Sequence, residues 1–250
     1  MNDKMSELNV INKIEISTCI LCGEELLKLK ESDTLRCDFC GKINQISNQC
    51  TNGHSICDEC LGLPVNQFIK ESCLKYKGTD PNELAVSIMN SPLVRMHGPE
   101  HHFIVPAVML TTTYNLQGKH NQVPEMLDKI EKIVEEESPK SCSYNLGNCG
   151  AAIGTGIFLK AYENIDNMTE DEWSLTNMII AQSLKKVAES GGPRCCKRDT
   201  YISIESAVEF LKEKYDIQLN LSEAKCTFSH RNKSCKREDC DYYNLNFSLV

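Results

Sequence analysis

From residue 64 onward, apolar residues recur every three to four positions, the spacing of helices that bury one face. The stripe is clearest in the segment 124–136, where its members are Met126, Leu127, Ile130, Ile133 and Val134. The pattern predicts helices at 64–76, 82–89, 99–110, 124–136, 149–162, 169–188 and 203–215. Strand signals are confined to the first sixty residues and a few short edges.

Local signals support several of these helix ends. Asp80 followed by Pro81 is typical of a cap with proline at the first helical position. Thr169 and Glu172 have the spacing of a capping box. Pro106 is expected to kink the helix that contains it, because proline lacks an amide hydrogen.

These elements predict a mainly α protein with two parts. We expect an N-terminal zinc-ribbon-like module with short β-strands at residues 1–62, followed by an all-α helical domain at 63–250. A chain of 250 residues is long enough to bury a hydrophobic core without crosslinks.

Charge and hydropathy limit the classes of function. The net charge of −8 disfavours non-specific binding to nucleic acid or membranes. No stretch reaches the length of uncharged apolar residues needed for a transmembrane helix, and the first seventeen residues are too polar for a signal peptide. We therefore expect a cytoplasmic protein without a membrane partner.

The chain contains fifteen cysteines, a high count for an ordinary globular chain. In a reducing compartment they are better explained by metal ligation or redox chemistry than by disulfides. Cys73 stands apart from the other groups, and we expect it to be a buried helix residue.

The N-terminal module contains two Cys-x2-Cys-Gly knuckles followed by a second set of ligands. Their members are Cys19, Cys22, Cys37 and Cys40, then Cys50, His54, Cys57 and Cys60. Seven cysteines and one histidine match two four-coordinate zinc ions. The two sets bind in sequence, or they interleave as in a RING-like cross-brace. The order of the ligands differs from that of RING domains, so we expect a structural role and not that of a ubiquitin ligase.

A histidine-rich segment precedes the 99–110 helix. His97, Glu100, His101 and His102 lie within six residues, and such a cluster is typical of a metal site or a general base. The alternative is a capped helix start with surface histidines.

Cys142 and Cys149 flank a glycine-rich helix start that includes Gly150 and Gly154. A helix N-terminus lowers the pKa of a thiol placed there, so Cys149 is a candidate reactive or ligating residue. The small residues let a cofactor or another backbone approach closely. Close helix packing explains the glycines equally well, but not the two cysteines.

Cys195 and Cys196 are adjacent, in a predicted turn with Arg194, Lys197 and Arg198. The cations are expected to lower the thiol pKa values and to hold an anionic ligand. The pair acts as two ligands, or as one ligand and one redox thiol. Together with Cys142 and Cys149 it supplies four thiolates, the number that a [4Fe-4S] cluster requires.

Three further cysteines, Cys226, Cys235 and Cys240, lie near the end of the chain with His230 between them. They form a third zinc site or supply ligands to the middle cluster. The surrounding basic stretch 230–237 is a candidate surface for RNA or an acidic partner, although few aromatics accompany it.

Several segments together resemble a domain family of unknown function from anaerobes. They are CTNGHSICDEC (50–60), MHGPEHHFIVPA (96–107), CGAAIGTGIF (149–158) and GGPRCCKRD (191–199), and the resemblance covers most of 50–240. Members of that family stand alone or are fused to radical-SAM or methyltransferase domains. The chain is also loosely similar to the C-GCAxxG-C-C redox family, but here the order is Cys-Gly-Ala-Ala.

Three functions remain open from the sequence. The first is a redox or cluster-carrying protein, with His97, Glu100, His101, Cys149, Cys195 and Cys196 as candidate catalytic residues. The second is a non-enzymatic, zinc-stabilised adaptor for a radical-SAM or methyltransferase partner, as the resemblance implies. The third and weakest is an RNA-binding or RNA-modifying protein.

Overall fold

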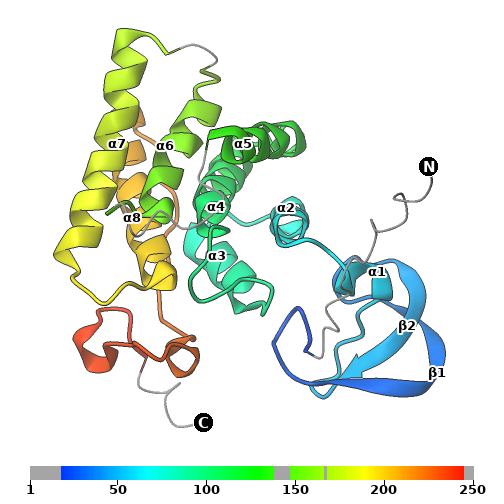
Figure 1. Ribbon diagram of the computed structural model, residues 1–250. Coiled ribbons are helices and arrows are strands. Elements are labelled where there is room, and N and C mark those ends of the chain that lie inside the picture. The colour runs from blue at the N-terminus through cyan, green and yellow to red at the C-terminus, as the bar shows by residue number, and fades with distance from the viewer. Residues whose placement is uncertain (1–17, 138–146, 166–167, 245–250) are drawn as a thin grey trace, which may run out of the picture. The chain divides into compact units, whose positions relative to one another are not determined.

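The computed structural model describes residues 18–137, 147–165 and 168–244 (Figure 1). The chain divides into two compact units, Met1–Gly62 and Leu63–Val250, and each is described by itself. The first is a small cysteine-rich β unit and the second is all-helical, which confirms the predicted fold class. None of the helices within the described ranges has the length and hydropathy needed to cross a membrane.

The first unit is built on one antiparallel hairpin. Strand β1 (Leu26–Arg36) pairs with β2 (Ile43–Cys50), and an irregularity lies between Lys28 and Asp33. A four-residue helix, α1 (Asp58–Leu61), follows. Besides the cysteines, its few large buried apolar side chains include Ile20, Ile46 and Ile56. So small a core contributes little to the stability of this unit.

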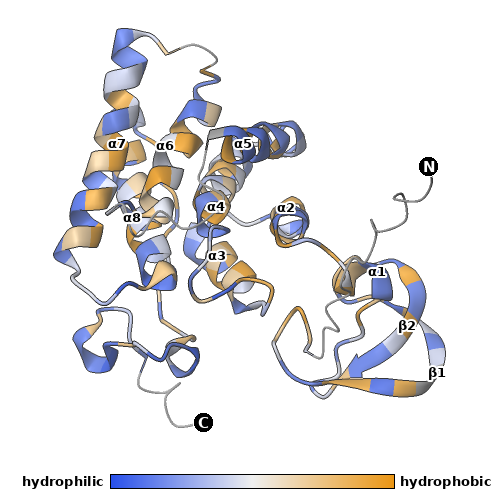
Figure 2. Cartoon of the chain, in the orientation of Figure 1, coloured by the Kyte–Doolittle hydropathy of each residue, from blue (hydrophilic) through white to orange (hydrophobic). Residues whose placement is uncertain are grey.

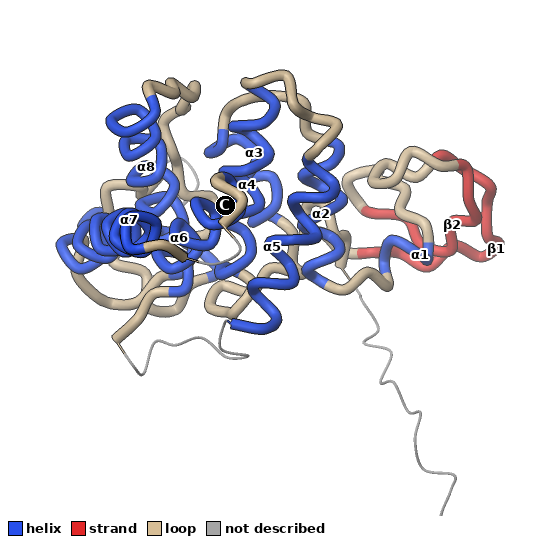
Figure 3. The backbone as a smooth tube through the Cα atoms, turned by 90° about the horizontal axis from the view of Figure 1, so that it is seen from above, coloured by secondary structure: helices blue, strands red, loops and turns tan. Residues whose placement is uncertain are grey.

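The second unit packs its helices around one central member. Helix α4 (His101–Leu116) is buried from His101 to Tyr114 and contacts five others (Figures 1 and 3). Those five are α2 (Val65–Lys75), α3 (Pro81–Asn90), α5 (Val123–Glu137), α6 (Gly150–Tyr162) and α8 (Cys196–Tyr215). Helix α7 (Glu170–Glu189) packs on α6 and α8 and carries many hydrophilic residues (Figure 2).

Most predicted helices appear close to their predicted bounds, including the capping box of α7. Helix α4 runs through Pro106 without ending. The prediction was wrong at α8, which begins at Cys196 and not at Ser203. Lys197 and Arg198, predicted to lie in a turn, are buried in the first turn of this helix.

Asp80 joins two distant segments and provides a first test of the fold. Its Oδ1 accepts from the amides of Asn82 (2.9 Å) and Glu83 (3.2 Å), and its Oδ2 accepts from the amide of Ser222 (2.9 Å). We expect Asp80→Ala to lower the free energy of unfolding by about 2 kcal/mol, because three amides lose a buried acceptor. Urea denaturation measures this. The exposed cap variant Thr169→Ala is the control, with a loss of about 1 kcal/mol; equal losses would contradict the buried role.

Candidate metal centres and ligand cavity

Two groups of four ligands lie in the first unit. Cys19, Cys22, Cys50 and His54 form one, which we call site one, and Cys37, Cys40, Cys57 and Cys60 form site two. Within each group, all ligand atoms lie within 4.8 Å of one another. Both groups are therefore able to hold a metal ion.

The interatomic distances match a tetrahedral metal. The Sγ atoms of Cys22 and Cys50 are 3.5 Å apart, and Cys19 Sγ lies 3.7 Å from His54 Nδ1. In site two, the Sγ atoms of Cys40 and Cys57 are 3.9 Å apart. Zn–S bonds of about 2.3 Å in a tetrahedron place sulfurs about 3.8 Å apart, so the ligands present fit zinc.

Three tight turns place these ligands. In each, a glycine amide donates to the carbonyl of a cysteine, as Gly23 does to Cys19 at 2.8 Å and Gly41 to Cys37 at 2.9 Å. These two glycines have φ values of +83° and +73°, which side chains rarely adopt. A third turn of the same kind closes with Gly53 donating to Cys50 at 2.7 Å.

Backbone amides also point at the sulfurs. Cys19 Sγ accepts from the amide of Leu21 and Cys50 Sγ from that of Asn52, each at 3.4 Å. Burial opposes ionisation of Cys37, but the amides of Cys40 and Cys57 outweigh it and bring its pKa to about 7. Such amide-to-sulfur bonds favour the thiolate that a metal requires.

The two ligand sets interleave, which decides between the alternatives left open by the sequence. The first knuckle joins the Cys50–His54 pair, and the second knuckle joins the Cys57–Cys60 pair. The two knuckles therefore do not share one ion. With four protein ligands each site is closed, as in structural zinc sites.

The helical unit contains a cavity of about 330 Å³ at the starts of α4, α6 and α8. Its polar lining comes from those first turns, and Leu184, Val187 and Ala188 of α7 form an apolar wall. The lining residues with reactive or charged groups are His101, His102, Cys149, Arg194, Cys196, Arg198 and Asp199.

A chain of polar contacts crosses this cavity. The Cys149 thiol donates to Asp199 Oδ2 at 3.7 Å, and Arg198 Nε donates to Asp199 Oδ1 at 3.2 Å. Burial, and then the Asp199 carboxylate, raise the pKa of Cys149 to about 11. The predicted lowering by the helix start was wrong, because the amides of Ala151 and Ala152 are outweighed.

Two buried polar atoms here have no hydrogen-bond partner. Arg198 Nε pairs with Asp199 and Nη2 donates to the Pro193 carbonyl, but Nη1 is unpartnered. His102 Nδ1 donates a hydrogen bond to the Pro99 carbonyl at 2.9 Å, which leaves Nε2 as an unpartnered acceptor. Buried polar atoms are rarely left without partners, so both point to a ligand.

The other candidates of the histidine segment have different roles. His101 is buried and not at the surface, and burial lowers its pKa to about 3. Its ring nitrogens contact Thr200 Oγ1 at 2.9 Å and the Arg95 carbonyl at 3.3 Å. Glu100 forms an ion pair with Arg95 at 2.9 Å. Neither His97 nor Glu100 lines the cavity.

The glycines of α6 are explained by packing against neighbouring helices. A Cβ on Gly154 would lie 2.9 Å from Pro106 Cδ and 3.1 Å from Val105 Cβ in α4. Gly150 leaves room for the ring of His102 and lines the cavity. Gly154 is therefore a packing residue, and its predicted role in cofactor binding was wrong.

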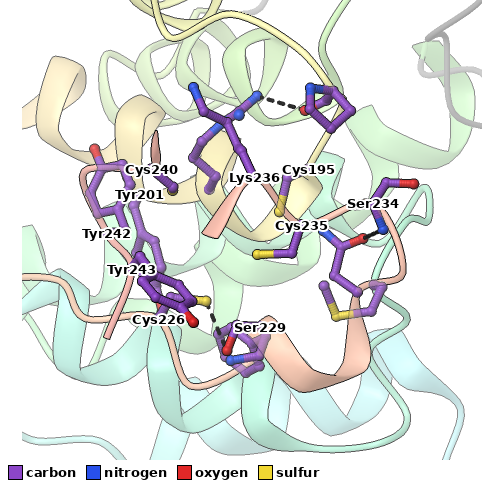
Figure 4. A pocket seen from close by; sticks show the side chains of 15 residues that line it. Cys195, Tyr201, Cys226, Ser229, Ser234, Cys235, Lys236, Cys240, Tyr242 and Tyr243 are labelled. Carbon is purple, nitrogen blue, oxygen red and sulfur yellow. Dashed lines mark hydrogen bonds between the residues drawn. The ribbon is translucent and has the colours of Figure 1, made fainter. Parts of the chain in front are cut away.

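Four cysteines line a second pocket (Figure 4), which we call the four-thiol pocket: Cys195, Cys226, Cys235 and Cys240. Tyr201, Phe228, Tyr242 and Tyr243 form much of its wall. Cys195 is the N-cap of α8, and the other three come from the tail with its short turns Ser229–Arg231 and Arg237–Asp239.

This pocket corrects the predicted grouping of the middle cysteines. Cys195 faces the tail cysteines, whereas its neighbour Cys196 lines the cavity with Cys149. The proposed set of Cys142, Cys149, Cys195 and Cys196 is thus divided, and Cys142 lies outside the described residues. His230 does not line the four-thiol pocket. Of the middle group, Cys195 lines the four-thiol pocket together with the tail cysteines, whereas Cys149 and Cys196 do not.

The cations of this region are more buried than the sequence indicated. Lys197 is fully buried, and its Nζ donates to the carbonyls of Met89 and Val94, each at 3.1 Å. Burial raises the pKa of the Cys195 thiol, so the predicted lowering by the three cations was wrong. None of the fourteen cysteines in the described ranges forms a disulfide.

Sequence reasoning missed three residues of the cavity region, namely His102 as an unpartnered acceptor, Asp199 and Thr200. Asp199 ends the GGPRCCKRD segment, and an acidic side chain beside an arginine in a helix's first turn was the available signal. The role of Thr200 depends on a contact with His101 across 99 residues, which no local pattern shows.

Comparison with known proteins gives a family but no activity. No curated protein matches the chain, and no solved structure matches it. A family model, described as a family of unknown function (DUF5714), matches residues 69–243. This span holds the cavity and the four-thiol pocket but leaves out both N-terminal tetrads. The chain therefore belongs to the DUF5714 family of unknown function.

Proposed function

We propose that this chain is a metal-thiolate protein that carries out redox or sulfur chemistry on a small anionic substrate. Two structural zinc ions stabilise the N-terminal unit, and an iron-sulfur centre in the helical unit carries electrons. The observation that carries the proposal is the cavity, where two thiols and two arginines meet at three helix starts.

Electrostatics favour an anion in this cavity. The N-terminus of each helix carries a partial positive charge, and α4, α6 and α8 all begin here. Arg194 and Arg198 add two positive charges against the single carboxylate of Asp199. The unpartnered Nη1 of Arg198 is a donor suited to a carboxylate or an oxyanion.

The remaining groups define what else the ligand carries. His102 Nε2 accepts a hydrogen bond, so a hydroxyl or amine on the ligand satisfies it. The apolar wall from α7 accommodates a short aliphatic part. Cys149 and Cys196 line the same cavity and therefore lie beside the bound molecule.

Binding of simple anions tests the proposal. Lactate, sulfate and phosphate are titrated into the full chain, purified without oxygen, and heat is measured by calorimetry. Lactate is expected to bind most tightly, because it offers a carboxylate and a hydroxyl. Arg194→Gln and Arg198→Gln are each expected to weaken binding at least tenfold, since a hydrogen bond to a charged group contributes about 1.5–3 kcal/mol.

Lys236→Gln is the matched control for charge. Lys236 lines the four-thiol pocket but not the cavity, and its Nζ donates to the Ser190 carbonyl at 2.8 Å. Its loss should leave anion binding unchanged. Equal weakening by all three variants, or no binding of any of the three anions, would contradict the proposed site.

The sequence resemblance supports an anaerobic setting and a radical-SAM or methyltransferase partner for this chemistry. As a non-enzymatic adaptor, the protein would bind such a partner equally well after Cys149 and Cys196 are replaced by serine. An RNA-binding role has less support, because two cations of the basic stretch bond to the chain itself. Arg231 Nη1 donates to the Asn90 carbonyl at 3.3 Å and Lys236 Nζ to that of Ser190.

A further inference from the structure

The four-thiol pocket brings four cysteine thiols together, which makes it a candidate cofactor site separate from the anion cavity. We propose that Cys195, Cys226, Cys235 and Cys240 are the four ligands of a [4Fe-4S] cluster. This inference rests on the proposed function, because the cluster is the iron-sulfur centre named there. One of its ligands comes from the middle group of cysteines and three come from the tail.

The backbone around these cysteines repeats the pattern of the zinc tetrads. Cys226 Sγ accepts from the amide of Phe228 at 3.3 Å, and Cys235 Sγ accepts from the amide of Arg237 at 3.4 Å. In both cases the donor lies two residues after the cysteine, as with Leu21 on Cys19 and Asn52 on Cys50. The same kind of amide-to-sulfur hydrogen bond therefore occurs in the tail and at the two N-terminal tetrads.

Two backbone hydrogen bonds and one ring contact hold the tail loops in place. The amide of Cys226 donates to the Tyr242 carbonyl at 2.7 Å, and the amide of Tyr243 donates to the Cys240 carbonyl at 2.8 Å. Tyr242 also stacks on Tyr201 of α8, with ring centroids 5.3 Å apart. The first and last cysteines of the tail are therefore fixed beside the start of α8, where Cys195 lies.

The four thiols are less closely gathered than the ligands of either N-terminal tetrad. Within the described residues, the groups with all ligand atoms inside 4.8 Å are the two N-terminal tetrads, and no three of these four thiols satisfy that limit. Zinc requires sulfurs about 3.8 Å apart. In a [4Fe-4S] cubane each thiolate binds a different iron at a separate corner, so its four sulfurs stand farther apart.

The charges around the pocket complement the cluster. A [4Fe-4S] core of charge 2+ with four thiolates has a net charge of −2. Arg198 and Lys236 line the pocket, and the buried Lys197 lies in the same turn of α8 as Cys195. Aromatic side chains limit the access of water, which protects iron-sulfur centres and tunes their potential.

The two adjacent cysteines thereby serve two neighbouring sites. Cys195 lines the four-thiol pocket and Cys196 lines the anion cavity, while Arg198 lines both. A cluster in this pocket would lie one residue away from the thiol of the substrate cavity. This placement suits electron transfer between the two, because it needs no mobile carrier.

Metal and sulfide analysis of the full chain tests the assignment. After reconstitution without oxygen with equal amounts of ferrous and ferric iron and with sulfide, which together supply the 2+ core, we expect about four irons and four acid-labile sulfides per chain, together with about two zinc ions. Cys235→Ser and Cys240→Ser should each lose most of the iron and the broad visible absorption, but keep the zinc. Helical circular dichroism shows whether each variant is folded.

Cys196→Ser and Cys149→Ser are the matched controls, because their thiols line the other cavity. Both should retain the iron. A third zinc and no iron in the wild-type chain would overturn the assignment, as would iron that survives Cys235→Ser but is lost with Cys196→Ser. Because the wild-type stoichiometry needs no variant, a misfolded variant does not obscure the result. Iron content and anion binding are measured separately, so a failure of one is distinguished from a failure of the other.

Discussion

Replacing Cys57 with serine is expected to unfold the whole N-terminal unit, with loss of metal from both tetrads. A structural zinc site contributes about 10–16 kcal/mol of apparent binding free energy, far more than so small a core supplies. The hairpin carries ligands of both sites, with Cys37 and Cys40 between its strands and Cys50 at the end of β2. Loss of site two therefore also releases a ligand of site one.

Zinc analysis combined with limited proteolysis measures this outcome. The variant should hold less than about half an equivalent of zinc and be cleaved rapidly within residues 18–62, while helical circular dichroism persists. Cys73→Ser is the control, because Cys73 is a free thiol buried in α2 and belongs to neither tetrad. A Cys57→Ser protein that keeps one full zinc ion would show that the two sites are independent.

Gly154→Leu is expected to destabilise the helical unit by about 3 kcal/mol or more. The first carbon of a new side chain would lie 2.9 Å from Pro106 Cδ, 3.1 Å from Val105 Cβ and 3.3 Å from the His102 carbonyl oxygen. Two of these atoms belong to a rigid ring or to the backbone of the central helix α4, so α6 would have to move away. Urea denaturation followed by circular dichroism measures the loss.

Gly156→Ala provides the comparison within the same helix. Its new Cβ would meet the end of the Ile180 side chain, which is able to rotate, and alanine favours the helix by about 1 kcal/mol over glycine. We expect a net change within about 1 kcal/mol of zero. Similar losses for the two variants would show that contact with α4 is not what requires glycine at 154.

The sequence was sufficient for features that depend on local chemistry. Helical periodicity and caps predicted most helices, because each cap involves residues two or three apart, as with Thr169 and Glu172. Knuckle spacing predicted eight ligands in the first unit, and these are the eight in the two tetrads. It did not predict how they pair, since sequential and interleaved sets have the same residues and the same spacing.

The start of α8 shows why the second site was only partly predictable. Lys197, Arg198 and Asp199 have the composition of an exposed turn, yet carbonyls from α3 and the loop after it accept from Lys197, and Arg198 pairs with Asp199. The two carbonyls that accept from Lys197 are more than 100 residues away in the chain, so no local pattern predicts this burial. Cys195 is the N-cap and has an extended backbone, whereas Cys196 is the first helical residue, so the two neighbours direct their side chains to different cavities.

The interleaving of the two tetrads also sets the order of events during synthesis. Site one needs His54 and site two needs Cys60, so neither is complete when the second knuckle leaves the ribosome at Cys40. Consecutive tetrads would have allowed the first zinc ion to be enclosed at that point. Here the four thiols of both knuckles lack their partner ligands until the rest of the unit has been translated. During that interval the four thiols are open to oxidation, and one metal ion is able to bind to both knuckles at once, which is not their pairing in the folded unit.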